Sequence, residues 1–323
     1  MNPDLISALE RLRSDRVLPE ATVARLLRMA RGQLVSLHAE LRLALYAGVL
    51  LVVTGVGLLL KENLTRIGPL AIAGGIAVVV AVLTVWVVRH VPPFSWAEAR
   101  ADHLAFDYLL LLAVLLGAAD LAYVEWQFTP LGAHWPTHLL LVSLAMAAIA
   151  LRCDSRLVFS LALSTFAAWR GVSISRFGPV LGDSLRTASA LRLETLGCGL
   201  LFLALGVLAR RLKRKAHFEP VAAHLGWIAI LLALLSGTGT RSGEELLFTL
   251  ALIGDGVVLA LLEARRPRFS LVALGMVASY VGVCLLFLRT GAGETAVAAW
   301  YAVTSLALLV LLFWLHRRLR ERT

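Results

Sequence analysis

Long apolar runs separated by short polar segments recur along the chain after its first forty or so residues. In hydrocarbon an unpaired backbone N–H or C=O costs several kcal/mol, so a spanning segment must form a helix or join a closed barrel. Barrel strands alternate apolar and polar residues, and these runs do not. The pattern predicts an all-α polytopic membrane protein with about ten transmembrane helices, over residues 43–60, 67–88, 104–124, 138–151, 156–169, 191–208, 221–236, 246–262, 270–287 and 297–315.

Two of these runs are short for a membrane span. A bilayer core of about 30 Å requires about 20 apolar residues in a helix. Residues 138–151 and 156–169 could form a thin helical hairpin around a turn at residues 152–156, or a re-entrant pair that never crosses completely. The second alternative would leave eight spans.

The basic residues give an independent check on the number of spans, because cytoplasmic loops collect Lys and Arg. With a cytoplasmic N-terminus, most of the basic residues fall in inner segments, including the clusters at residues 210–215 and 265–268. Removing one span from the middle would place both clusters and the C-terminal tail outside. Residues 138–169 are therefore expected to cross twice or not at all, and both termini are expected to be cytoplasmic.

The net charge of +10 changes this picture little. It is expected to set topology and to attract anionic lipids, with about 1 kcal/mol for each well-placed basic residue. Nucleic-acid binding is not expected, because the basic residues are spread over separate inner segments without interleaved aromatic residues. The excess of Arg over Lys, with abundant Ala and Leu, is typical of a GC-rich genome and favours a bacterial cytoplasmic (inner) membrane.

Residues 1–41 differ in composition from the rest and are predicted to form a cytoplasmic amphipathic helical hairpin, followed by a transmembrane helical domain over residues 42–323. In the second helix of the hairpin, apolar residues recur at heptad spacing. The hairpin could pack on itself or lie on the inner leaflet. Alternatively, Leu27 and Leu34 could dock a partner protein or a second copy of the chain. The heptad positions are Val23, Leu27, Ala30, Leu34, Leu37 and Leu41.

The same region resembles a known family. A Val17-Leu18-Pro19-Glu20-Ala21 turn joins the two N-terminal helices, the first span contains Gly48, Gly55 and Gly57, and a polar Lys61-Glu62-Asn63 turn follows it. Over about residues 1–170 this arrangement resembles the bacterial membrane family catalogued as domain of unknown function 2157. The resemblance implies a multi-spanning membrane protein. It implies no activity and no site residues.

Ionisable residues inside predicted spans are candidates for function, because an acid at the centre of a membrane helix costs about 2.5 to 3.5 kcal/mol. Asp255 lies between two glycines near the predicted midplane, where it could bind a proton or a cation, or join two helices by a hydrogen bond. Asp120, a second candidate for ligand binding, lies towards the outer end of its span. With Glu125 it could face an outer cluster of Arg170, Arg192 and Glu194, which would more simply be an ion-pair network.

Motifs for cofactors and metals are not found in the sequence. The three cysteines lack CxxC spacing, and no HExxH, GxxxxGK[ST], GxSxG or GxGxxG after a strand occurs. No cofactor and no metal site are therefore expected, and the protein is not expected to be an enzyme. The sequence favours a non-catalytic membrane module or subunit that docks through its N-terminal helices. The alternative is a secondary transporter or channel for a small solute or ion that uses Asp255.

Overall fold

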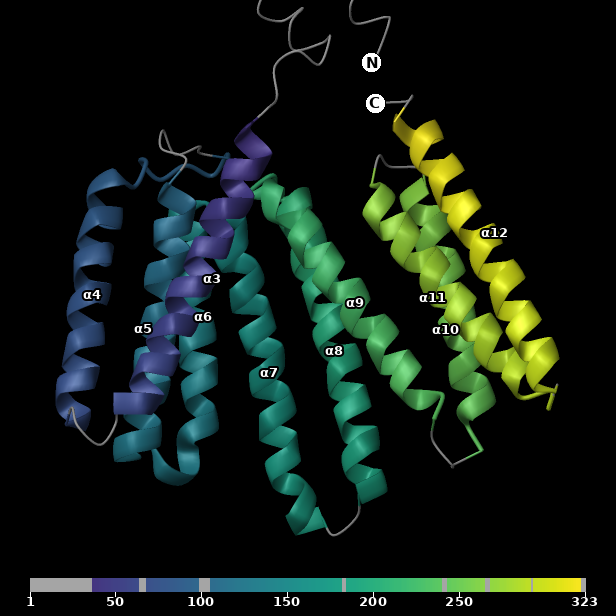
Figure 1. The fold of residues 1–323 in the computed structure, drawn as a ribbon, viewed down its shortest axis with the longest axis horizontal. Coiled ribbons are helices and arrows are strands. Elements are labelled where there is room, and N and C mark those ends of the chain that lie inside the picture. The colour runs from purple at the N-terminus through teal and green to yellow at the C-terminus, as the bar shows by residue number, and fades with distance from the viewer. Residues whose placement is uncertain are drawn as a thin grey trace, which may run out of the picture. The chain divides into compact units, whose positions relative to one another are not determined.

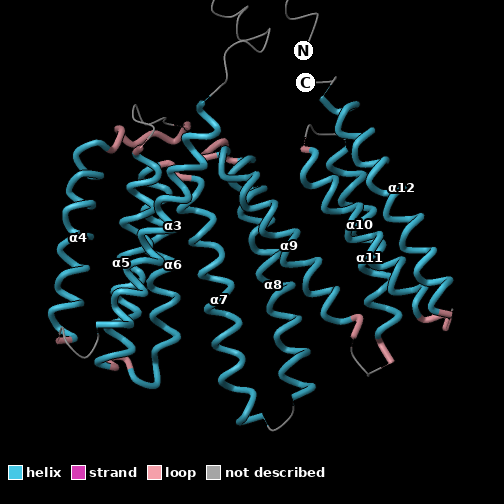
Figure 2. Tube along the Cα trace, in the orientation of Figure 1, coloured by secondary structure: helices cyan, strands magenta, loops and turns pink. Residues whose placement is uncertain are grey.

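The protein is a bundle of α-helices. The computed structural model describes residues 37–63, 68–98, 105–181, 184–239, 243–264, 268–291 and 293–320. These residues contain ten α-helices, two short 3-10 helices and no strand (Figures 1 and 2). In chain order the elements are α3 (Leu37–Asn63), α4 (Pro69–His90), α5 (Phe106–Phe128), η1 (Gly132–His134), α6 (Trp135–Cys153), α7 (Arg156–Leu181), α8 (Ser184–Arg211), η2 (Ala216–Phe218), α9 (Glu219–Gly237), α10 (Glu245–Ala264), α11 (Phe269–Leu288) and α12 (Glu294–Arg320).

Each predicted span corresponds to one of these helices, which confirms the all-α polytopic fold. Eight of the helices are long and apolar enough to cross a membrane, and the other two are α3 and α7. The two short runs extend into helices of 19 and 26 residues, α6 and α7. At 1.5 Å per residue, these helices measure about 28 and 39 Å, so both are about as long as a bilayer core is thick, although only α6 is also apolar enough to be one of the eight. The sequence underestimated α6 because Trp135-Pro136 begins it before its apolar run, and α7 because the helix continues beyond residue 169 to Leu181.

The N-terminal segment lies largely outside the described residues. Residues 1–36, which include most of the predicted hairpin together with Leu27 and Leu34, are not described. Helix α3 begins at Leu37, so the predicted boundary between residues 41 and 42 falls inside a continuous helix.

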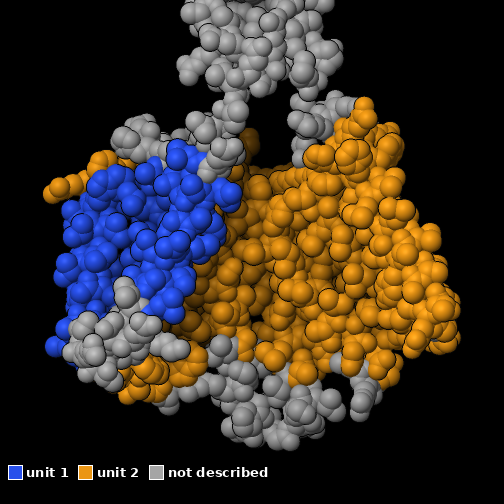
Figure 3. Space-filling model, in the orientation of Figure 1, with its two compact units in different colours: residues 1–87, 103–120 blue, residues 88–102, 121–323 orange. Residues whose placement is uncertain are grey.

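The chain divides into two compact units, which are coloured separately in Figure 3. Unit 1 comprises residues 1–87 and 103–120, and so contains α3, most of α4 and the first part of α5. Within it α4 packs on α5. The rings of Trp86 and Phe106 lie 6.5 Å apart, and a Cβ on Gly117 would lie 3.6 Å from the Val80 side chain.

Unit 2 comprises residues 88–102 and 121–323. Its helices α6 to α12 alternate in direction, and each connection is short (Figure 1). One end of this helix layer holds the α6–α7 and α8–α9 connections and the C-terminal ends of α10 and α12 (Figure 1). We call it the basic side, and it corresponds to the predicted cytoplasmic side.

Three helix pairs within unit 2 are joined by small or polar residues. In α6–α7, the Ser143 hydroxyl donates a hydrogen bond to the Ala162 carbonyl at 3.0 Å. In α8–α9, a Cβ on Gly199 would lie 2.8 Å from the Gly226 carbonyl oxygen. In α10–α11, a Cβ on Gly256 would lie 2.6 Å from the carbonyl oxygen of Gly275 on α11. Small residues let helix backbones approach closely in a membrane, where lipid is as apolar as Leu.

Apolar clusters link these pairs to one another. Leu163 of α7, Phe202 of α8 and Ala222 of α9 belong to one buried cluster. Leu231 of α9, Leu259 of α10 and Leu271 of α11 belong to another. The last helix, α12, packs on α11 through three contacts. The rings of Phe287 and Trp300 are stacked, those of Phe269 and His316 meet edge to face, and the Tyr280 and Thr304 hydroxyls are hydrogen-bonded.

Candidate functional site

Asp255, the first predicted site residue, is half-buried on α10. Its two glycine neighbours differ. Gly256 lies at the close contact with α11, whereas a Cβ on Gly254 would meet open space. Among the described residues, the Asp255 carboxylate has no hydrogen bond or ion pair. The predicted alternative of a hydrogen bond between helices is therefore not found in the described part of the chain.

The direction of Asp255 follows from helix geometry. Residues seven apart lie on nearly the same face of a helix, so Asp255 shares a face with Phe248. A Cβ on Gly237 of α9 would collide with the Phe248 ring, so this face of α10 lies against α9. Gly256 on the neighbouring face lies against α11. Asp255 therefore lies on the α9 side of α10.

Asp120, the second predicted ligand-binding residue, belongs to unit 1. Its Oδ1 atom is buried and has no hydrogen-bond partner among the described residues.

The predicted outer cluster is only partly formed. Arg170 of α7 and Glu194 of α8 form an ion pair through a short contact. Glu125 instead accepts a hydrogen bond from the Leu131 N–H at 3.1 Å, and the Arg192 guanidinium lies 5.2 Å from the centre of the Phe248 ring. The charges of this cluster are thus distributed over separate contacts.

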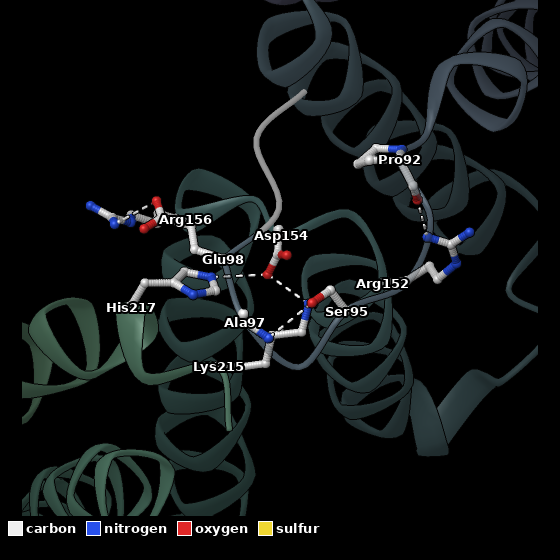
Figure 4. Close-up of polar contacts among 9 residues, drawn as sticks. All are labelled: Pro92, Ser95, Ala97, Glu98, Arg152, Asp154, Arg156, Lys215 and His217. Atoms are coloured by element: carbon white, nitrogen blue, oxygen red, sulfur yellow. Dashed lines mark hydrogen bonds and ion pairs between the residues drawn. The ribbon is translucent and has the colours of Figure 1, made fainter. Parts of the chain in front are cut away.

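A buried cluster of ionisable side chains on the basic side was not expected from the sequence. The carboxylate Oδ1 of Asp154 lies 2.7 Å from Lys215 Nζ and 3.0 Å from His217 Nε2. The exposed fractions of the three side chains are 3 %, 4 % and 6 %, respectively. Figure 4 shows both contacts converging on Asp154. We call Asp154, Lys215 and His217 the buried ion-pair cluster.

The backbone conformations of two connections bring these side chains together. Only Asp154 and Ser155 separate α6 from α7, and Asp154 adopts a left-handed conformation with φ of 57°. Lys215, before η2, is also left-handed, with φ of 51°. A non-glycine residue in this region costs about 1–3 kcal/mol unless its surroundings hold it there. The ion pair between the two residues provides such surroundings.

The connection between α4 and α5 is attached to the same place. Residues 91–98, which we call the connecting segment, belong to unit 2. The Lys215 N–H donates a hydrogen bond to the Trp96 carbonyl at 2.8 Å, and Lys215 Nζ lies 4.9 Å from the Phe94 ring centre. Arg152 Nη1 donates to the Pro92 carbonyl at 2.9 Å.

A further ion pair on the segment completes its attachment. Arg156 Nη2 lies 2.9 Å from Glu98 Oε1 (Figure 4). The connecting segment is therefore fixed to both the α6–α7 and the α8–α9 connections.

A second charged contact joins the α8–α9 connection to α11. Glu219, the first residue of α9, is 6 % exposed and forms a short ion pair with Arg268, the residue before α11. The hydrogen bond to Glu219 raises the pKa of Arg268 above its ordinary value. Nearby, His224 Nε2 lies 2.7 Å from the Ser270 hydroxyl. Residues 215–219 of the α8–α9 connection thus contact the connecting segment, the α6–α7 connection and the start of α11.

These groups are suited to holding helices together. Burying an ion costs several kcal/mol, which the attraction between partners offsets only with good geometry. Here the Asp154 carboxylate has two cationic or potentially cationic neighbours, and the Lys215 ammonium has a carboxylate and an aromatic ring. No group of three or more His, Cys, Asp or Glu side chains suited to a metal ion occurs among the described residues.

A partial signal for this site is present in the sequence. Residues 152–156 were recognised as a turn and residues 210–215 as a basic cluster, but nothing connected them. Asp154 is an acid between Arg152 and Arg156 in an otherwise basic inner segment, which is the one local sign that it pairs with a cation.

Comparison with known proteins finds no family model, no curated protein and no solved structure that matches the chain. The resemblance of residues 1–170 to domain of unknown function 2157 stays a prediction.

Proposed function

We propose that the protein is a non-catalytic module of a bacterial inner-membrane complex, which binds its partner through the N-terminal helices. The observation that supports this proposal is the buried ion-pair cluster. Its charges are occupied by contacts between helices and so are not presented to a substrate. Together with the Glu219 to Arg268 pair, they hold the connections of the basic side in one arrangement. A surface fixed in advance loses less entropy when a partner binds.

The test uses the full-length chain and the predicted docking residues. We expect wild-type protein, purified in a mild detergent, to retain a partner or a second copy at a constant ratio in quantitative mass spectrometry. Leu27→Asp with Leu34→Asp should release it, because charged residues cannot occupy an apolar heptad seam. The matched control, Leu27→Met with Leu34→Met, keeps both positions apolar and should retain it.

Two results would contradict this proposal. One is a wild-type protein that is always a lone monomer in mild detergent. The other is retention of the same partner, at the same ratio, by the Asp variant.

Asp255 favours a second candidate function, transport of a proton or a small cation. A half-buried carboxylate without a described partner, within a membrane helix, could bind a cation. In proteoliposomes with a pH-sensitive dye inside, Asp255→Asn should abolish pH-dependent uptake while leaving the melting temperature near that of wild type. Glu294→Gln removes an acid from the first turn of another helix, α12, and serves as the control. Unchanged flux in Asp255→Asn would remove this candidate.

A further inference from the structure

The connecting segment presents two aromatic side chains on the basic side of unit 2. Phe94 and Trp96 are 49 % and 52 % exposed, and their rings meet edge to face with centres 5.1 Å apart. The guanidinium of Arg214 lies 4.6 Å from the centre of the Trp96 ring. An exposed pair of aromatic rings beside a cation is therefore held at the ends of membrane helices α6 and α8.

Exposed cations surround these rings. Glu98 pairs with Arg156, and Asp154 compensates Lys215, so neither acid neutralises the remaining basic residues nearby. Arg152 uses Nη1 for the Pro92 carbonyl, and the other donors of its guanidinium remain for another acceptor. The exposed basic residues that remain on the α6–α7 and α8–α9 connections and helix ends are Arg152, Arg210, Arg211, Lys213 and Arg214.

Apolar side chains lie next to these cations along the chain. Leu151 precedes Arg152 and is 42 % exposed, while Leu208 and Leu212 at the end of α8 are 51 % and 57 % exposed. Along α6 and α8 an exposed apolar surface is thus followed by exposed cations at the helix end, where the two aromatic rings of the connecting segment also lie. A phospholipid has the same order, with acyl chains, then a phosphate at the headgroup level, where Trp side chains also gather.

We propose that Arg152, Lys213 and Arg214, together with Phe94 and Trp96, bind the phosphate headgroup of an anionic phospholipid. Guanidinium groups match phosphate oxygens in pairs, and basic pockets between membrane helices on the cytoplasmic side bind anionic headgroups. The acyl chains lie along the exposed leucines of α6 and α8. None of these five residues belongs to the predicted N-terminal helices, so the proposal can be tested independently of partner docking.

Lys213 offers a variant that removes charge with little effect on the fold. It is exposed and left-handed, with φ of 53°, a conformation that glycine adopts readily. Lys213→Gly therefore relieves backbone strain while it deletes one cation. The second variant, Trp96→Leu with Arg214→Gln, removes the Trp96 ring and the Arg214 guanidinium beside it. It keeps the hydrogen bond from the Lys215 N–H, because that bond uses the backbone carbonyl of residue 96.

The chain also contains a matched control. At the end of α12, Arg318 lies 5.1 Å from the centre of the Trp314 ring, and Trp314 is 52 % exposed, as Trp96 is. Trp314→Leu with Arg318→Gln therefore makes the same chemical change on the same basic side. This pair lies on another helix and does not include the connecting segment.

The experiment titrates phosphatidylglycerol or phosphatidylcholine into the detergent-purified full-length protein. Retained lipid is counted by native mass spectrometry, and the melting temperature is measured in parallel. We expect wild type to retain phosphatidylglycerol in preference to phosphatidylcholine. Retention should weaken by about tenfold in the Trp96 and Arg214 variant and by severalfold in Lys213→Gly, because each interfacial cation contributes about one decade or less. The control variant should stay within about twofold of wild type.

Four results would overturn the proposal. Equal loss in the control variant would show a general charge effect, and equal retention of both lipids would show no headgroup preference. Displacement of phosphatidylglycerol by millimolar inorganic phosphate would indicate a site for soluble anions, and displacement by an acidic peptide would indicate a protein-binding surface. If the Trp96 and Arg214 variant has an abnormal melting temperature without lipid, the retention of phosphatidylglycerol by Lys213→Gly is used instead, and unchanged retention by that variant contradicts the proposal.

Discussion

At the scale of single residues, the buried ion-pair cluster shows how a membrane protein keeps charges at the ends of its helices. Asp154 and Lys215 are both nearly inaccessible, and each removes part of the cost of burying the other. Their left-handed backbones are compatible with very short connections. The cluster therefore holds the α6–α7 connection against the α8–α9 connection. Both of its paired charges are used in this contact.

The Asp154 to Lys215 contact leads to a test of its contribution to stability. Asp154→Asn keeps the shape and suits a left-handed backbone, but it leaves the Lys215 ammonium buried without a charged partner. Removing one partner of a buried pair costs about 3–5 kcal/mol, so the melting temperature in detergent should fall clearly.

A second substitution serves as the control for this prediction. Lys215→Met on top of Asp154→Asn removes the unpaired charge and should recover most of the loss. If the double variant melts as low as the sum of the two single effects, the pair does not hold the turns together.

At the scale of elements, the helix pairs of unit 2 depend on positions without a side chain. At Gly256 an added Cβ would meet the Gly275 carbonyl oxygen and the Ser279 hydroxyl of α11. Gly199 and Gly226 play the same role between α8 and α9. Because these neighbours include backbone atoms, a larger residue can fit only if the helices separate.

Two glycines on α10 make this argument testable within one helix. Gly256→Ala should lower the melting temperature, since its Cβ would lie 2.6 Å from a backbone oxygen. Gly254→Ala meets open space and should be neutral or slightly stabilising, because alanine favours a helix over glycine by about 1 kcal/mol. Equal effects of both substitutions on melting in one detergent would show that the close contact at Gly256 is unimportant.

At the scale of the whole molecule, the described residues contain ten helices, and eight of these are long and apolar enough to cross a membrane. The 2.7 Å contact between Asp154 and Lys215 shows that the α6–α7 turn lies at the same end of unit 2 as the α8–α9 connection. Helices α6 and α7 therefore run between the two ends of unit 2, which favours two crossings by residues 138–169 over none.

Reporter fusions can check this topology and the predicted orientation. Fusions after Lys215, Arg268 and Thr323 should report the cytoplasm, because basic connections remain inside. Fusions near Trp135, Ser184 and Gly291 should report the outside. A cytoplasmic signal at Ser184 combined with an outside signal at Thr323 would contradict ten spans.

The sequence by itself determined where the membrane helices lie. In hydrocarbon each segment must satisfy its own backbone hydrogen bonds, so an apolar run of sufficient length defines a helix whatever its neighbours are. The runs at residues 246–262 and 270–287, for example, became α10 and α11 with changes of one or two residues at their ends. The two glycines beside Asp255 look alike in the sequence, and only the structure shows that Gly256 lies at a close helix contact while Gly254 does not.

Only the tertiary structure decided which residues meet. Asp154 and Lys215 are 61 positions apart, and Glu219 and Arg268 are 49 apart. Hydropathy cannot predict such contacts, because lipid is as apolar as the helices and provides no preference for one helix face over another. The choice depends on shape, on the small residues that let backbones touch, and on the short connections that bring distant charges to the same end of unit 2.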